Sequence, residues 1–383
     1  MKEKIIKLYE EGLSSYEIAR QLPISSSYAR RIVRNYKAYD TKFGKHCSER
    51  GIELEKVNQY WDKTNQYSVQ VKPNYEQDFD AIEEINTLLE NYIPNGNKVK
   101  VKPNKSKQIA QFFYTDAHVG MNPNAEEKSL YGGSWGEKDL FARLEIVKQQ
   151  LLLNVPKEVD CLQILNLGDF ADGLDKKTVR RQHDLPQNMT NTEVFDVGVR
   201  FKIELLEFIY SNFSFNRLVW YNVCNSNHSS DFDYFICQAF KGISKHYEKI
   251  EVINNREFMG HIIHGKHCEI ISHGKDDVNL KFGFKATLDE KAYKKIDEYI
   301  KHYKLSKYII TFHKGDSHLR VDDKTNQDFN YCSYYAFSPS SSWVQVNFQK
   351  GRSGFTIRLK YVDKRSGEIV KDFEFKWNSN KLN

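Results

Sequence analysis

From about residue 108 onward, short apolar runs alternate along the chain with longer amphipathic segments. Apolar runs of this length predict buried strands, and apolar residues that recur every three or four positions predict helices. The expected strands span 109–114, 162–167, 218–223, 269–272 and 308–312. The expected helices between them span about 137–152, 192–212, 231–243 and 288–304. This alternation indicates a layered α/β fold.

The pattern changes near the C-terminus, where single apolar residues alternate with polar ones. The alternation covers 355–361 and, after a turn at 364–367, resumes over 373–377. A period of two predicts strands with one buried face, and the short turn joins them as an antiparallel hairpin. This hairpin is expected to close the domain.

The first 45 residues carry the periodicity of three short helices. The first covers 2–11 and stops at Gly12, and the second follows a capping box formed by Ser14 and Glu17. The third is expected at about 26–36, with its apolar residues inward and its arginines outward. The inward residues are Ala29, Ile32 and Val33.

A tight turn before a basic third helix resembles the helix-turn-helix of resolvases and homeodomains. The resemblance implies that this helix enters the major groove of DNA and that its outward residues contact bases or phosphates. Those residues would be Ser26, Tyr28, Arg30, Arg31 and Arg34. A small helical bundle that binds another protein is the alternative.

The charge distribution favours nucleic acid as the partner of this segment. The net charge is +6 over 383 residues, and residues 1–45 hold ten Lys or Arg against five Asp or Glu, a net of +5. A basic terminal module is typical of nucleic-acid binding. Charge alone also fits an ordinary solvated helical surface.

Composition places the whole chain among globular proteins, with 40% hydrophobic and 28% charged residues. No apolar stretch reaches the roughly 18 residues of a membrane span. The N-terminus does not look like a signal peptide, and the six cysteines are scattered, so we expect a reduced, cytoplasmic setting. Three regions are expected: a helix-turn-helix domain at 1–45, a linker or small accessory region at 46–105, and the α/β domain at 106–383.

The accessory region carries two local patterns. Trp61, Tyr67, Val69 and Val71 could form a short strand pair or a second small unit. Residues 78–92 predict an acidic helix with one apolar side. The residues on that side are Ile82, Ile85, Leu88 and Leu89.

Five short polar motifs follow the apolar runs of the α/β domain. Each contains Asp, His or Asn, which can bind a metal ion. They lie at 116–118, 168–172, 227–228, 273–274 and 315–318. Ligands of α/β folds gather beyond the carboxyl ends of the strands, and all five motifs fall at such ends. The spacing therefore predicts a two-metal site at one edge of a sheet.

In their order, the motifs resemble those of the calcineurin-like metallophosphoesterases: DxH, GDxxD, GNH, a lone His and GHxH. The resemblance covers about 110–345 and implies a two-sheet β-sandwich flanked by helices. It also implies two divalent ions, Mn²⁺ first and Mg²⁺, Fe²⁺ or Zn²⁺ as alternatives. Carried over by position, the metal ligands would be Asp116, His118, Asp169, Asn227, His273, Asp316 and His318. Asp169 would bridge both ions, and His228 would be the catalytic histidine that is not a ligand.

Two positions depart from the family pattern. Ser226 replaces the glycine before Asn227, and Asp316 replaces the first histidine of the last motif. An aspartate ligates through oxygen and would favour harder ions, whereas a weakened or single-metal site is the alternative. His313 could compensate for the missing histidine or could merely pack. Asp172 is expected to orient a ligand rather than to bind metal.

Residues that could select the substrate follow the bridging aspartate. The segment 178–188 holds Arg180, Arg181 and His183, and it resembles a stretch of phage-encoded members of the family. Arginine suits phosphate because its fork binds two oxygens, although a solvated basic loop would look the same. Further positions are Lys275, Lys314 and the loop 338–343. His261, His264 and His267 are expected on a hairpin with exposed side chains.

Together these features predict a DNA-targeted two-metal phosphodiesterase, a nuclease in which a hydroxide bridging the metals attacks phosphorus. The alternatives are a phosphatase or phosphodiesterase acting on nucleotides, cyclic nucleotides or phosphoproteins, and a DNA-binding regulator with a degenerate metal site. DNA is the expected partner and a membrane is not. A dimer is possible, and a phage-encoded protein would act in the host cytoplasm. Endo- or exonuclease action, polarity and the DNA site stay open.

Overall fold

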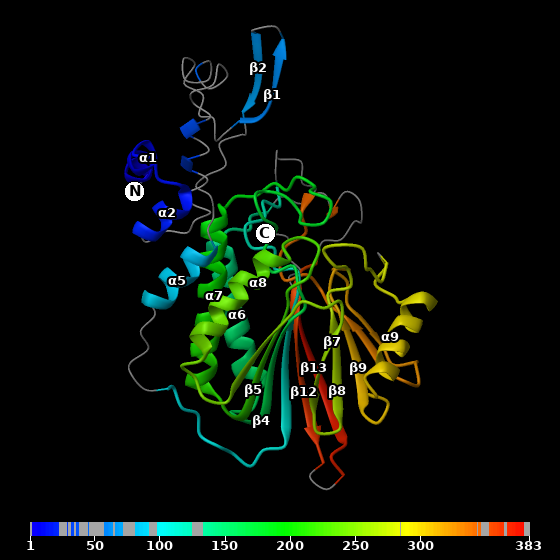
Figure 1. Ribbon diagram of the computed structural model, residues 1–383. Coiled ribbons are helices and arrows are strands. Elements are labelled where there is room, and N and C mark those ends of the chain that lie inside the picture. Colours follow the sequence, from blue (N-terminus) through cyan, green and yellow to red (C-terminus); the bar gives the residue numbers. More distant parts are fainter. Residues whose placement is uncertain are drawn as a thin grey trace. The chain divides into compact units, whose positions relative to one another are not determined.

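In the computed structural model, fourteen stretches of the chain are described (Figure 1). They are residues 2–22, 29, 32–33, 36–37, 45, 57–63, 66–71, 81–91, 98–124, 133–283, 285–342, 344–345, 352–363 and 366–378. The chain divides into two compact units, Met1–Asp78 and Phe79–Asn383. The five residues expected to contact DNA, among them Ser26 and Arg34, lie outside the described residues.

The N-terminal unit contains helices α1 (Lys2–Glu10) and α2 (Ser15–Gln21). The expected capping box is present, since the Ser14 hydroxyl accepts the N–H of Glu17 and the Glu17 carboxylate accepts the N–H of Ser14. A small core joins both helices to the three residues predicted to face inward. Its buried members are Ile5, Ile18, Ala29, Ile32 and Val33. The predicted strand pair is also present, as the antiparallel strands β1 (Val57–Lys63) and β2 (Gln66–Val71).

The second unit is built on two β-sheets. The six-stranded sheet has the order β13-β12-β3-β4-β5-β6, and the five-stranded sheet has the order β10-β11-β9-β8-β7. The first sheet comprises β3 (Gln108–Tyr114), β4 (Glu158–Asn166), β5 (Ser214–Val223), β6 (Ile250–Asn255), β12 (Gly354–Val362) and β13 (Ile369–Asn378). The second comprises β7 (Gly260–His264), β8 (His267–Ser272), β9 (Ile309–Lys314), β10 (Val321–Asp323) and β11 (Asn330–Ser333).

Helices cover the outer faces of this sandwich, as predicted (Figure 1). They are α5 (Ala81–Asn91), α6 (Glu137–Asn154), α7 (Asn191–Asn212), α8 (Asp231–Ser244) and α9 (Glu290–His302). Successive residues of a strand point to opposite faces, and β3 shows the result. Phe112 packs in the core beneath α6, α7 and α8, whereas Phe113 packs between the two sheets. The third core lies between the five-stranded sheet and α9.

The five strands and four helices predicted for this unit are all present, with ends that differ by a few residues. The C-terminal hairpin is also present, but β12 lies inside the sheet rather than at its end. It pairs antiparallel with β3, where Ile357 lies opposite Phe112. The first strand of the domain is therefore held between β4 and a strand from the far end of the chain.

The four apolar residues of α5 differ in burial. Ile85 and Leu88 pack against the core and Leu89 lies against Gly242 of α8, whereas Ile82 is 71% exposed. One prediction needs correction. The histidines of the β7–β8 hairpin are not exposed. His267 is buried, His261 Nδ1 lies 2.9 Å from the Tyr299 hydroxyl, and His264 Nε2 lies 3.2 Å from Asp160 Oδ2.

Two findings bear on the setting of the chain. None of the described helices is long and apolar enough to cross a membrane. The cysteines that fall in described stretches are buried free thiols. These are Cys161, Cys224, Cys237, Cys268 and Cys332.

Candidate metal centre

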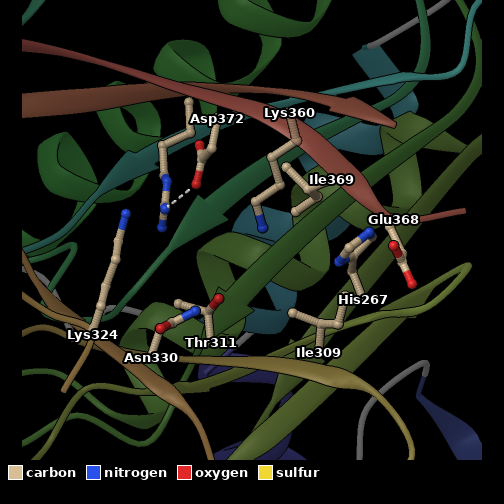
Figure 2. Close-up of a pocket in the computed structure, with 10 residues that line it drawn as sticks. His267, Ile309, Thr311, Lys324, Asn330, Lys360, Glu368, Ile369 and Asp372 are labelled. Atoms are coloured by element: carbon tan, nitrogen blue, oxygen red, sulfur yellow. Dashed lines mark hydrogen bonds and ion pairs between the residues drawn. The ribbon is translucent and has the colours of Figure 1, made fainter. Parts of the chain in front are cut away.

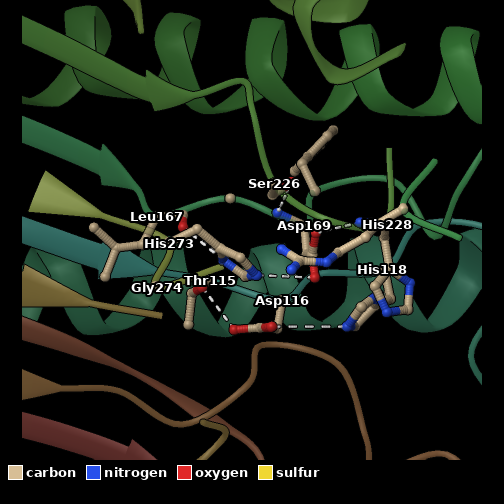
Figure 3. Close-up of polar contacts among 12 residues, drawn as sticks. Thr115, Asp116, His118, Leu167, Asp169, Ser226, His228, His273 and Gly274 are labelled. Carbon is tan, nitrogen blue, oxygen red and sulfur yellow. Dashed lines mark hydrogen bonds and ion pairs between the residues drawn. The ribbon is translucent and has the colours of Figure 1, made fainter. Parts of the chain in front are cut away.

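The sheet topology brings the five polar motifs to one place. Strands β3, β4 and β5 are parallel neighbours in one sheet, and β8 and β9 are parallel neighbours in the other. The carboxyl ends of neighbouring parallel strands meet at the same sheet edge. Figure 3 shows the resulting cluster, in which Asp116, Asp169 and His273 come from three different strand ends.

Three groups of side chains in this cluster have the spacing needed to hold a cation. Within each group, the Asp oxygens and His nitrogens lie within 4.8 Å of one another. The groups are Asp116, His118 and His318; His118, Asp169 and His228; and Asp116, Asp169 and His273. Because the groups share Asp116, His118 and Asp169, they form one continuous ligand field. Such a field is wide enough for two neighbouring ions.

The buried carboxylates are held close to imidazoles. Asp116 Oδ1 lies 3.0 Å from His318 Nε2, and Asp169 Oδ2 lies 3.0 Å from His273 Nε2. Burial opposes ionisation of Asp169, but the charge of His273 outweighs it and lowers the pKa of that carboxyl. Burial likewise opposes protonation of His273, yet the Asp169 carboxylate raises the pKa of the imidazole to about 10. The site is therefore organised around buried negative charge that needs positive partners.

Two observations show that the donor set fits divalent ions. Asn227 Oδ1 is buried and has no hydrogen-bond partner among the described residues, so its lone pairs are available to a cation. His273 Nδ1 lies 2.9 Å from the carbonyl oxygen of Leu167, which directs the other nitrogen, Nε2, into the cluster. Mixed imidazole and oxygen donors suit first-row transition ions.

The backbone at this edge adopts unusual conformations. Five of the predicted ligands have positive φ although none is glycine. They are Asp116 (53°), His118 (43°), Asp169 (47°), Asp316 (58°) and His318 (52°). Such conformations are costly for residues with a Cβ and cluster at functional sites. Gly315 is a glycine for lack of space, since a Cβ at this position would lie 2.4 Å from Thr115 Oγ1.

Asp172 lies between two histidines of the cluster. Its Oδ1 is 3.0 Å from His118 Nδ1 and 3.4 Å from His228 Nδ1. The backbone N–H of His228 also donates to Asp169 Oδ1 at 3.1 Å. Burial opposes protonation of His228, but Asp169 and Asp172 raise its pKa to about 9. Asp172 thus has the orienting position expected for it, and His228 sits beside the carboxylate predicted to bridge the ions.

Ser226 and Asp233 support the bridging position, and the sequence patterns did not single out Asp233. The backbone N–H of Asp169 donates to Ser226 Oγ at 2.9 Å, and the N–H groups of Phe170 and Ala171 donate to Asp233 at 3.1 and 2.8 Å. Neither Asn225 nor Ser226 has positive φ, so the turn accepts serine in place of glycine. The only local signal from Asp233 is an acidic residue in the first turn of α8, which is common in helices.

The structure places Asp316 at the cluster and His313 away from it. Asp316 borders the cavity at the cluster but belongs to none of the three groups, and its charge helps to raise the pKa of His273. His313 lies in the interior, with Nε2 2.7 Å from Glu269 Oε2 and Nδ1 2.8 Å from the Tyr334 hydroxyl. Of its two possible roles, packing is the one observed.

A cavity of about 640 Å³ opens over the cluster and is bordered by His118, Asp169, Asn227, His228 and His318. Its rim carries basic residues from two loops and an apolar wall. The basic residues are Arg181, His183, Lys275 and Lys281, and the wall is formed by Met121, Leu185, Pro186, Pro339 and Val344.

Arg180 also borders the cavity, but it is buried and its Nη1 donates to the carbonyl oxygens of Asp276 and Leu280 at 2.8 and 3.1 Å. Arg180 therefore ties the loop 276–280 to the segment after the bridging aspartate. Lys314 is buried and donates to the Lys285 carbonyl oxygen at 3.1 Å.

No protein-family model and no curated protein matches this chain. Solved structures that match this chain include Vps29 of Chaetomium thermophilum, 12% identical over 44% of this chain and 81% of that one, with a TM-score of 0.21. A phosphatase from Mycoplasma pneumoniae is 10% identical over 72% of this chain and 94% of that one, with a TM-score of 0.31. A dimetal phosphatase from Danio rerio is 9% identical over 71% and 99%, with a TM-score of 0.32. At these values, the function of the chain has to be argued from its own residues.

Proposed function

We propose that this chain is a metal-dependent phosphoesterase of the calcineurin-like type. The observation that carries the proposal is the continuous ligand field of Asp116, His118, Asp169, His273 and His318 beneath a basic-rimmed cavity. When bound, two divalent ions would act as Lewis acids on the phosphoryl oxygens and lower the pKa of water. The motif order that resembles this family points to the same chemistry.

The protein's own residues have separable roles in this proposal. Asp116, His118 and His318 would hold one ion, Asn227 and His273 the other, and Asp169 would contact both. Asp316, which borders the same cavity, would add a carboxylate oxygen to the second set. Arg181 and His183 on the rim would bind the remaining charge of the phosphate.

His228 is the residue proposed to move a proton. Its Nδ1 faces Asp172 at 3.4 Å, so Nε2 is the nitrogen left for the substrate. A histidine held in this way can stabilise the departing oxygen or protonate it. Asp172 would set the ring orientation, because the same carboxylate oxygen also faces His118.

The cavity favours small phosphate esters as substrates. A volume of about 640 Å³ accommodates a nucleotide, a cyclic nucleotide or a phosphorylated side chain. The wall that includes Leu185 and Pro186 offers apolar contact to the organic part of such an ester, while the basic rim faces its phosphate. We therefore place nucleotide-sized esters first among the substrate classes.

The test is hydrolysis of a panel of esters by the full chain with Mn²⁺, comparing the parent with His228→Asn. The panel contains bis(p-nitrophenyl) phosphate, nucleoside monophosphates, cyclic nucleotides and DNA. We expect the variant to lose about 10²- to 10⁴-fold in kcat while it keeps its bound metal. His302→Asn, a change at an exposed histidine of α9, is the matched control. Equal rates for parent and His228→Asn would refute the proposed role of His228. If the purified chain contains no divalent metal, the result would instead support a degenerate metal site.

Hydrolysis of DNA is a second candidate, favoured by the net charge of +5 in residues 1–45. In this candidate the N-terminal unit holds DNA and the metal centre cleaves it. Its test is binding of the full chain to duplex DNA over a range of salt concentrations. Replacing Arg30, Arg31 and Arg34 with alanine should weaken binding. It should also make the slope of log K against log salt concentration less steep, by up to about three, because up to three fewer phosphates would be neutralised. Unchanged binding by the triple variant would exclude the third helix as the DNA-contacting surface.

A further inference from the structure

A second cavity, of about 310 Å³, lies between the two sheets at the end away from the metal centre. Its lining includes His267 and Ile309, the first residues of β8 and β9. The metal centre lies beyond the opposite ends of these same strands, at His273 and Asp316. The second cavity is therefore a separate site on the same sandwich.

Polar side chains from both sheets surround this cavity (Figure 2). His267, Thr311 and Asn330 come from β8, β9 and β11 of the five-stranded sheet. Lys360 and Arg358 come from β12 of the six-stranded sheet. In Figure 2, the ammonium group of Lys360 and the polar ends of Thr311 and Asn330 point toward the same open centre.

Two buried side chains at the cavity hold unused hydrogen-bonding atoms. His267 is only 3% exposed, and neither of its ring nitrogens has a partner with hydrogen-bond geometry among the described residues. The backbone of Gly367 is near enough to influence the pKa of the ring, but not in that geometry. The Nε–H of Arg358, also 3% exposed, has no partner among the described residues either. Buried polar groups are nearly always satisfied, so such atoms indicate a ligand or ordered water.

The carboxylates near the cavity are paired with basic side chains, which leaves hydrogen-bond donors in its lining. Asp372 Oδ2 accepts Arg358 Nη2 at 2.6 Å. Glu368 is exposed, and its carboxylate lies 4.0 Å from Lys266 Nζ. Lys360 Nζ donates to Glu269, but an ammonium group has three donors, so two more are available. The carboxylates of Asp372, Glu368 and Glu269 are thus each paired with a basic side chain. The N–H and O–H groups of Lys360, Arg358 and Thr311 are left to donate hydrogen bonds to a ligand.

We infer that this cavity is a binding site for a small oxyanion, a carboxylate or a phosphate. Such a ligand accepts several hydrogen bonds at once and would satisfy the buried donors of His267 and Arg358. The ammonium of Lys360 would add a charge-assisted bond, which is stronger than a neutral one. The cavity volume limits the ligand to a small molecule. The inference does not depend on the reaction at the metal centre.

The experiment measures binding of inorganic phosphate and of citrate to the metal-free full chain by calorimetry. Removing the metals excludes coordination of these probes at the other site. The test variants are His267→Gln and the nearly isosteric Thr311→Val, and the control is Lys294→Gln, at an exposed lysine of α9 that does not line the cavity. We expect each test variant to weaken binding about tenfold, the effect of one hydrogen bond to a charged group. The control should leave binding unchanged.

The two probes and the variants make the outcomes distinct. Binding of phosphate alone, or of citrate alone, supports the site and identifies its ligand class. Absence of binding by either probe at millimolar concentration overturns the inference. So does binding that both test variants retain, or binding that is lost only when Arg181 and His183 at the metal-centre cavity are replaced. Thermal unfolding of each variant establishes that it is folded.

Discussion

The carboxylate of Asp233 accepts the backbone N–H of Ala171 at 2.8 Å, although the two residues are 62 positions apart in the chain. The same carboxylate accepts the N–H of Phe170 at 3.1 Å, and both donors belong to the turn that follows Asp169. A fully buried side chain on α8 therefore holds the turn that presents the central carboxylate of the metal centre.

Replacing Asp233 with alanine should damage both stability and metal binding. Two buried N–H groups would lose their acceptor, which costs about 3 kcal/mol of unfolding free energy in total. The turn would also lose its support, so we expect weaker Mn²⁺ binding. Urea unfolding and metal titration measure the two effects. Asp231→Ala, an exposed change in the same helical turn, is the control; it removes a surface ion pair with Arg256, so it should cost less than about 1 kcal/mol and leave metal binding unchanged. Full metal affinity in a folded Asp233→Ala protein would contradict the assigned role.

Gly315→Ala should disturb the metal centre by crowding. The added Cβ would lie 2.4 Å from Thr115 Oγ1 and 2.9 Å from His273 Nδ1, which are closer than normal contacts. We expect a loss of about 1–3 kcal/mol of stability and displacement of the His273 ring. Unfolding and metal content of the purified protein are the measurements. Gly136→Ala, whose Cβ would come no closer than 3.9 Å to Asp139 Oδ2, causes no such crowding; it should cost less than about 1 kcal/mol, through the weaker helix N-cap, and leave the metal content unchanged. Equal behaviour of the two variants would rule out crowding at this position.

Binding of divalent ions at the proposed metal centre should stabilise the folded chain, because this cluster of side chains forms only on folding. Mn²⁺ at a hundredfold excess over its dissociation constant should add about 3 kcal/mol, and chelation should remove it. Thermal unfolding with Mn²⁺ and with EDTA measures the difference. The gain should be absent from Asp169→Asn and intact in Asp297→Asn, a change on the surface of α9. A gain of the same size in Asp169→Asn would show that the ions act elsewhere.

His313 should make stability fall in mild acid. Burial lowers the pKa of its imidazole from 6.5 to about 4, which outweighs the opposing effect of Glu269, while Arg358 and Lys360 lower it further. Between these values the unfolded chain binds a proton that the folded chain does not. This contribution is therefore complete above pH 6.5 and is lost as the pH falls toward 4, by about 3 kcal/mol.

The measurement is the unfolding free energy of parent and His313→Gln across this pH range. The variant is expected to be less stable at neutral pH, where it leaves the Tyr334 hydroxyl and Glu269 with poorer partners. The gap should close as the pH decreases from 6.5 to about 4. His302→Gln, at an exposed histidine, should follow the parent throughout. A gap that is constant with pH would mean that His313 titrates alike in both states.

Features that depend on neighbours in the chain could be predicted from the residues alone. The capping box of Ser14 and Glu17 spans three positions, and both of its hydrogen bonds are present. The strand before Asp116 and the strand before Asp169 were visible as apolar runs bounded by polar residues. Because strands that end in potential ligands tend to meet at one sheet edge, their convergence could also be anticipated.

Features that depend on packing between distant segments could not be predicted from the residues alone. An alternating strand has two faces, and its pattern does not say what covers each of them, which is why the insertion of β12 beside β3 was not foreseen. His267 belongs to a hairpin that looked exposed, yet the opposite sheet covers it. The carbonyl oxygen of Leu167, which orients His273 across 106 positions, carries no sequence signal, since every residue has such a group.

The sequence by itself thus determined the succession of strands and helices and the residue types able to bind metal, because periodicity and side-chain chemistry are local properties. Only the tertiary structure decided which of these residues share a ligand field, with Asp316 beside it and His313 apart from it. It also decided the roles of Ser226 and Asp233, and the existence of a second cavity. Distances of a few ångströms between segments far apart in the chain arise from the packing of the two sheets, which no local pattern encodes.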